Sequence, residues 1–167
     1  MDATADELAG VVDLFGGLSR AELERALSEA AFRADGGSID ERALGEAIDE
    51  GLESFTLLEC STECLATDAP TLDSGTDLFV SGPAAFPTVP EYAEDVPHIL
   101  DIERRRFDRD ALGAAARARF SDAIDAARDG GPDGDRLRDL REVSYDIEAW
   151  GPVELDDERA RIEEGLD

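Results

Sequence analysis

Residues 4–30, TADELAGVVDLFGGLSRAELERALSEA, carry two complete helix signals in succession. Each begins with a capping box, first Thr4 with Glu7 and then Ser19 with Glu22, in which a hydroxyl and a carboxylate three residues later satisfy the first backbone donors. Apolar residues follow both boxes at helical spacing, and a glycine pair ends the first run. This stretch predicts two amphipathic helices joined by a short turn.

The rest of the first half predicts a third helix and a hairpin. The helix is expected from Asp40 to about Leu52, and strands are expected over 55–60 and 77–80. Three helices followed by a two-stranded hairpin resemble a winged helix. Residues 1–82 are therefore predicted to be winged-helix-like.

The second half is predicted to be helical. Residues 83–95 are proline-rich and predict a stiff connector. Helices are expected from about Val96 to Arg106, from Asp108 onward, over 135–149, and from Asp156 near the end. The predicted fold class is mainly α with a small antiparallel β-hairpin. Residues 96–167 either form a separate helical half or pack with residues 1–82 as one unit.

The composition indicates a protein that works in near-saturating salt. The 167 residues include 42 acidic and 16 basic ones, which gives a formal charge of −26, and they contain no Lys, Asn or Gln. Hydrophobic residues still make up 42% of the chain, so disorder is not expected. At about 1 M salt the Debye length is only about 3 Å, and the repulsion among carboxylates is screened. The acidity alone is therefore no evidence for a basic partner.

Location and metal binding are constrained by what the chain does not contain. Residues 1–20 have no secretion signal, and no window reaches the roughly 18 apolar residues of a membrane span, so a cytoplasmic protein without membrane contact is expected. Cys60 and Cys64 make no disulfide framework, and a zinc site would need two further ligands where His98 is the only histidine. We expect no metal and no cofactor.

Basic residues gather in one place, Glu103 to Arg109, which nets +2. Arg104, Arg105, Arg106 and Arg109 could bind phosphate, or they could form ion pairs with the acidic first half, and the second interpretation is favoured. The helix expected over 40–52 is strongly acidic and has Arg42 as its single basic residue, whereas DNA affinity depends largely on basic contacts, so nucleic-acid binding by this helix is not expected.

Aromatic residues gather near the end of the helix expected over 135–149. Tyr145 and Trp150 could form a binding hot spot, but the cap of a small core is the favoured interpretation. Spacing identifies no catalytic residue, phosphate loop or nucleophile elbow, and no enzyme is expected. A deep pocket that gathered carboxylates with Tyr145 and His98 would favour an enzyme after all.

Four stretches carry a resemblance to a known family: VVDLFG at 11–16, GPAAFP at 82–87, VPHILD at 96–101 and YDIEAW at 145–150. The chain resembles an uncharacterised family, a domain of unknown function, from extremely halophilic archaea. This resemblance agrees with the salt argument and implies no activity. The leading hypothesis is a non-enzymatic protein-interaction or regulatory module with an unidentified protein partner. The alternative is a DNA-associated transcription regulator that uses the arginine-rich residues 104–109.

Overall fold

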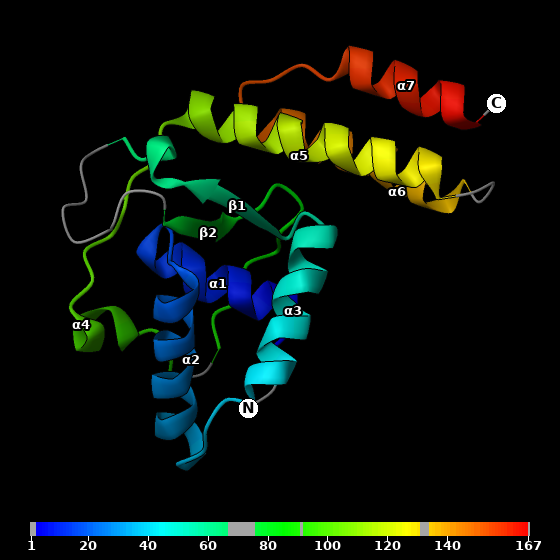
Figure 1. Cartoon of the computed structure of the whole chain (residues 1–167). Helices are drawn as coiled ribbons and strands as arrows, with labels where there is room; N and C mark the ends of the chain where they lie inside the picture. The colour runs from blue at the N-terminus through cyan, green and yellow to red at the C-terminus, as the bar shows by residue number, and fades with distance from the viewer. Residues whose placement is uncertain (1–2, 67–75, 91, 131–133, 167) are drawn as a thin grey trace. The chain divides into compact units, whose positions relative to one another are not determined.

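The computed structural model describes residues 3–66, 76–90, 92–130 and 134–166 of the chain. These residues form seven α-helices, one short 3-10 turn and one two-stranded antiparallel sheet (Figure 1). The predicted fold class, mainly α with a small antiparallel hairpin, is confirmed. The chain divides into two compact units, Met1–Asp108 and Arg109–Asp167, which are described separately.

The first three helices begin at the predicted caps. The side chain of Thr4 accepts a hydrogen bond from the Glu7 amide and that of Glu7 accepts one from the Thr4 amide, both at 3.2 Å. Ser19 and Glu22 form the same reciprocal pair, and Asp40 caps the third helix. The helices are α1 (Ala5–Phe15), α2 (Arg20–Asp35) and α3 (Glu41–Glu53). Local capping interactions therefore determine where each of these three helices begins.

The hairpin consists of β1 (Leu57–Ser61) and β2 (Asp77–Ser81), with Glu59 opposite Phe79. β1 starts two residues later than predicted because Phe55 has a left-handed backbone, with φ of 63°. β2 also pairs with Leu18, whose amide donates to Phe79 O at 3.0 Å and whose carbonyl accepts from Phe79 N at 2.7 Å. Leu18 lies between α1 and α2, and its pairing with the hairpin is compatible with a winged helix.

A single hydrophobic cluster holds the first unit together. Residues from α1, α2, α3 and both strands contribute, and several side chains have no exposed area: Leu8, Val12, Phe15, Leu23 and Leu27. Ala93 and Val96, which lie near the end of the proline-rich stretch, belong to the same cluster. Residues 83–108 belong to the first compact unit.

The proline-rich stretch is fastened to α1. Asp6 accepts from the Phe86 amide at 3.2 Å through its side chain and from the Thr88 amide at 3.1 Å through its carbonyl. At the crossing point a Cβ on Gly10 would lie 2.2 Å from Thr88 O, so only glycine permits this approach.

The helix predicted from Val96 to Arg106 is wrong in its length, because α4 covers only Val96–Leu100. Asp101 adopts a left-handed backbone with φ of 54° and ends the helix. Backbone amides after Asp101 donate to carbonyls far away in the sequence and not to carbonyls of the same helix. The Arg105 amide donates to Phe15 O and the Asp108 amide to Cys64 O, both at 2.8 Å.

The second unit consists of three helices that contact one another pairwise. They are α5 (Arg109–Asp129), α6 (Asp135–Trp150) and α7 (Asp156–Leu166). Their buried apolar side chains recur at helical spacing: Ala116, Phe120 and Ile124 on α5, Leu137, Leu140 and Ile147 on α6, and Ile162 on α7. The predicted helices over 135–149 and from Asp156 are observed. The helix expected from Asp108 onward begins at Arg109.

Candidate functional site

Arg105 is the buried member of the arginine-rich segment. Its Nη1 lies 2.6 Å from Glu22 Oε1 and its Nη2 lies 2.8 Å from Glu22 Oε2, and Nη1 also donates to Gly17 O at 3.0 Å. Only 8% of the Arg105 side chain and 15% of the Glu22 side chain is exposed. This arrangement is the internal ion pair that the sequence analysis favoured.

The acidity of Glu22 reflects its partners. Burial by itself raises the pKa of Glu22, but hydrogen bonds from Arg105 and from the Ser19 amide outweigh burial and hold the pKa below its ordinary value. Glu22 therefore remains ionised while it serves both as the partner of Arg105 and as the carboxylate of the α2 capping box.

Arg104 and Arg109 bind backbone carbonyls at helix ends. Arg104 Nη1 donates to Asp13 O at 2.6 Å in the last turn of α1, and Arg109 Nη2 donates to Trp150 O at 2.6 Å at the end of α6. Cations at these positions donate to carbonyls of the last helical turn and interact favourably with the negative end of the helix dipole. The side chain of Arg106 is exposed and has no polar partner among the residues that the structure describes.

Tyr145 and Trp150 are placed differently from one another. Tyr145 is 54% exposed on α6, and the Arg159 guanidinium lies 4.7 Å from the centre of its ring. Trp150 is half-buried at the C-terminal end of α6, where its carbonyl binds Arg109. The candidate residues therefore fall into two sets, with Arg104, Arg105 and Arg106 in the first unit and Arg109, Tyr145 and Trp150 in the second.

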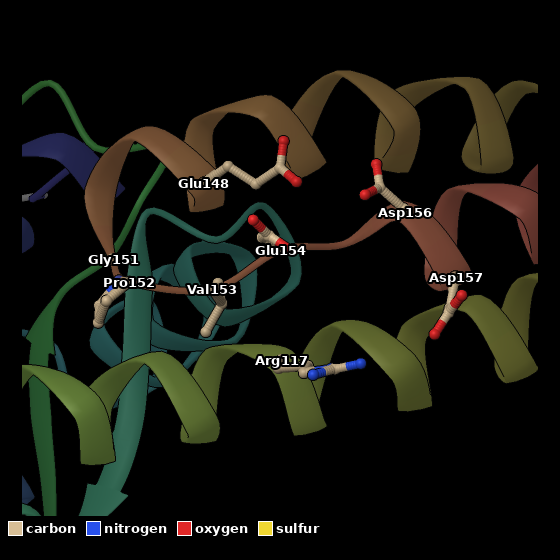
Figure 2. A pocket seen from close by; sticks show the side chains of 8 residues that line it. All are labelled: Arg117, Glu148, Gly151, Pro152, Val153, Glu154, Asp156 and Asp157. Carbon is tan, nitrogen blue, oxygen red and sulfur yellow. The ribbon is translucent and has the colours of Figure 1, made fainter.

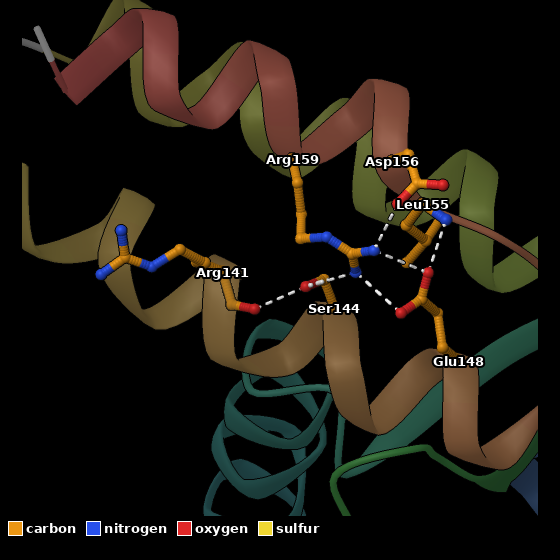
Figure 3. A network of polar contacts seen from close by, with 6 residues as sticks. All are labelled: Arg141, Ser144, Glu148, Leu155, Asp156 and Arg159. Carbon is orange, nitrogen blue, oxygen red and sulfur yellow. Dashed lines mark hydrogen bonds and ion pairs between the residues drawn. The ribbon is translucent and has the colours of Figure 1, made fainter.

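A polar network centred on Arg159 was missed by the sequence analysis (Figure 3). Arg159 donates to both carboxylate oxygens of Glu148, at 2.8 and 3.0 Å, to Asp156 at 2.8 Å and to Ser144 at 3.2 Å. The hydrogen bonds from Arg159, together with one from the Leu155 amide, lower the pKa of Glu148. From the sequence alone, only Asp156 and Arg159 could have been recognised as a pair, because they lie three residues apart on one helix.

An open groove of about 840 Å³ lies beside this network in the second unit (Figure 2). Arg117 projects from α5, and the remaining lining comes from the end of α6, the following turn and the start of α7: Glu148, Gly151, Pro152, Val153, Glu154, Asp156 and Asp157. Arg117 is bound to Glu158 at 2.7 Å, and Glu148 is held ionised by Arg159. The polar side chains of the lining are four carboxylates, Glu148, Glu154, Asp156 and Asp157, and the guanidinium of Arg117.

A second groove, here called the hairpin groove, lies in the first unit and has a volume of about 530 Å³. It is bounded by the start of α2, one face of α3 and the hairpin. Ile48, Leu52 and Phe79 are its larger apolar residues, Asp49, Glu59 and Asp77 supply carboxylates, and Arg20 supplies a guanidinium. Burial, and then the neighbouring carboxylate of Asp77, raise the pKa of Glu59.

A comparison with protein families identifies the chain. The model of a family of unknown function (DUF7109) matches residues 6–167. The chain belongs to this family. No curated protein and no solved structure matches this DUF7109 chain.

The two cysteines of this DUF7109 chain are buried and unpaired. Burial, and then the neighbouring Cys64, raise the pKa of the Cys60 thiol, so it stays protonated and is a poor nucleophile. His98 is exposed on α4. Within residues 3–66, 76–90, 92–130 and 134–166, no three His, Cys, Asp or Glu side chains are grouped so that they could hold a metal ion.

Exposed apolar side chains are concentrated in residues 83–100 of the DUF7109 chain, here called the apolar segment. Phe86 is 80% exposed, and Val89, Tyr92 and Ile99 are each more than one-third exposed. Phe32 and Tyr145 are the other exposed large apolar residues in the part of the chain that the structure describes. No described helix is both long and apolar enough to cross a membrane.

Proposed function

We propose that this DUF7109 chain is a non-enzymatic protein-interaction module of a high-salt cytoplasm, and that it binds its partner through the apolar segment. One observation carries the proposal: Phe86, Val89, Tyr92 and Ile99 are exposed within 14 residues of a chain whose surface is otherwise rich in carboxylates. Isolated exposed apolar residues are ordinary, but a concentration of them is typical of an interaction site.

High salt makes apolar contacts the natural basis for binding. At about 1 M salt the Debye length falls to about 3 Å, so attraction between exposed charges contributes little. Burial of apolar surface does not depend on charge and is not screened. The backbone of this segment is already ordered by its hydrogen bonds to Asp6, which lowers the entropy cost of binding.

The test is a pull-down from lysate kept at native salt, with the wild type, a Phe86→Ser/Tyr92→Ser variant and a Phe32→Ser/Tyr145→Ser control. The control removes the same number of exposed aromatic residues from other places. We expect one discrete partner with the wild type and the control, and its loss with Phe86→Ser/Tyr92→Ser. Equal recovery by all three proteins contradicts the proposal.

A DNA-associated transcription regulator is the second candidate, and the exposure of Arg104 and Arg106 favours it. The internal contacts of Arg104, Arg105 and Arg109 reduce the charge available to phosphate, and the exposed face of α3 carries Glu41, Glu46, Asp49, Glu50 and Glu53. Single alanine variants of Arg104, Arg105, Arg106 and Arg109 separate the two functions by filter binding to duplex DNA at native salt. DNA binding that weakens uniformly across DNA sequences, while the melting temperatures of the variants stay unchanged, would favour the regulator.

A further inference from the structure

Two prolines restrict the backbone in the most exposed part of the apolar segment. Pro87 and Pro90 fix their own φ near about −65°, and a residue before a proline, here Phe86 or Val89, is held in the extended or polyproline II region. Residues 85–90 accordingly belong to no helix or strand. Four of the five residues from Phe86 to Pro90 therefore carry a restriction that favours a polyproline II conformation.

The exposed side chains follow the polyproline II period of three residues. Phe86 and Val89 are three apart and are 80% and 38% exposed, so they share one side of such a helix. The backbone between them is fastened to α1, because the Phe86 amide donates to the Asp6 side chain at 3.2 Å and the Thr88 amide to Asp6 O at 3.1 Å. Residues 86–89 therefore form an ordered ridge with apolar side chains in solvent, here called the proline ridge.

We infer that the proline ridge docks into a groove of another protein that is lined by tyrosine and tryptophan side chains. This inference rests on the proposed interaction function and names the chemistry of the partner's site. Aromatic-lined grooves bind proline-rich extended segments because the extended conformation exists before binding and little entropy is lost. Phenol and indole groups also donate hydrogen bonds, which the carbonyls of a polyproline II segment accept since they make none within the segment.

A second copy of the chain does not fit this description. The 167 residues contain one Trp and two Tyr. Trp150 is half-buried, and Phe79 is the one aromatic residue among the linings of the two grooves described above. A copy would also bring a second charge of −26. Because Glu94 and Asp95 are exposed shortly after the ridge, charge complementarity favours a groove with a basic rim and opposes nucleic acid and anionic lipid as occupants.

The experiment is photo-crosslinking of the full chain in a lysate kept at native salt, with the diazirine amino acid photo-leucine in place of Val89. The control carries photo-leucine in place of Phe32, which is 65% exposed on α2. Crosslinked peptides are sequenced by mass spectrometry. We expect position 89 to join one partner, at a segment that lies beside Tyr or Trp side chains in that partner's structure, and the control not to join this segment.

The purified partner is then titrated with the Pro87→Ala variant, which keeps the exposed apolar side chains but frees the backbone of Phe86 and of residue 87. Pro87 is exposed, so its replacement should leave the fold intact. We expect the Kd to rise about two- to fivefold, because a more flexible ridge loses more entropy on binding. Pro152→Ala, which replaces an exposed proline of the second unit, is the control and should leave the Kd unchanged.

Four results would overturn the inference. They are no crosslink from position 89, a crosslink to a segment without aromatic neighbours, a crosslink to lipid or to a second copy of the chain, and equal Kd values for Pro87→Ala and Pro152→Ala. The proposed function fails by a different result, which is retained partner binding by Phe86→Ser/Tyr92→Ser. Loss of binding in that variant together with any of the four results would leave the apolar segment as the binding site and remove only the aromatic groove.

Discussion

Arg105 and Glu22 form a two-pronged ion pair between positions 83 residues apart, with N–O distances of 2.6 and 2.8 Å. The pair connects the extended residues after α4 to the first turn of α2, and both side chains are largely buried. Because Glu22 also completes the α2 capping box, one carboxylate links local helix initiation to long-range packing.

Removal of Arg105 should destabilise the first unit strongly. The Arg105→Ala variant leaves the Glu22 carboxylate buried without its partner, which typically costs about 3–5 kcal/mol. Thermal melts followed by circular dichroism at native salt measure this loss. The control is Arg42→Ala, since Arg42 and Glu46 form an exposed pair on α3 that should contribute almost nothing. Equal melting temperatures for the two variants would contradict the assigned role of Arg105.

The same pair predicts a dependence on acid. The pKa of Glu22 is lower in the folded chain than its ordinary value of 4.5, so ionised Glu22 stabilises the fold above that value. As the pH falls through 4.5 toward the lowered folded pKa, the contribution is lost, because the unfolded chain binds the proton more tightly. The difference in melting temperature between wild type and Glu22→Gln should therefore be large at pH 7 and shrink below about pH 4.5.

Glu59 supplies the opposite case within the same unit. Its folded pKa is raised, so its ionisation destabilises the fold as the pH rises through that pKa. Glu59→Gln should raise the melting temperature at pH 7, by an amount that corresponds to less than about 1 kcal/mol, and this gain should disappear in acid. A gain that is constant from pH 3.5 to pH 7 would show that like-charge repulsion with Asp77 is not its cause.

Features that depend on neighbouring residues were predicted well from the sequence. The caps at Thr4, Ser19 and Asp40 act within three residues of themselves, and the helices begin where they indicate. Predictions failed where distant backbone decided the outcome. The segment after Leu100 contains helix-forming residues, yet its amides pair with Phe15 and Cys64, and the helix stops.

The candidate sites show the same limit. An internal role for the arginine-rich segment was the favoured prediction, and the contacts of Arg105 agree with it. Nothing in the sequence identified Glu22 as its partner among 42 acidic residues. The hairpin groove was missed because the face shared by Glu59 and Asp77 follows from the strand register, and a shift of one residue would have placed them on opposite faces.

In the second unit, Arg159 should be the main polar contact between α6 and α7. The Arg159→Ala variant removes hydrogen bonds to Glu148, Asp156 and Ser144 and should cost about 1.5–3 kcal/mol. Urea unfolding of the full chain at native salt measures it. Arg141→Ala is the control, because Arg141 also joins α6 to α7, through Glu163, but in a more exposed setting. An equal effect of the two substitutions would argue against a special role for the Arg159 network.

The whole fold should depend on salt. With a formal charge of −26, the carboxylates repel one another over about 10 Å at 0.1 M salt but over only about 3 Å at 1 M. We therefore expect the helical circular-dichroism signal to fall as KCl is lowered from about 1 M to about 0.1 M. Sucrose stabilises compact states without screening charge and should not restore the signal as KCl does. The variant Glu41→Gln/Glu50→Gln carries two fewer charges and should unfold at a lower salt concentration than the wild type. A helical signal that persists unchanged at about 0.1 M KCl would refute adaptation to high salt, because the repulsion is then barely screened.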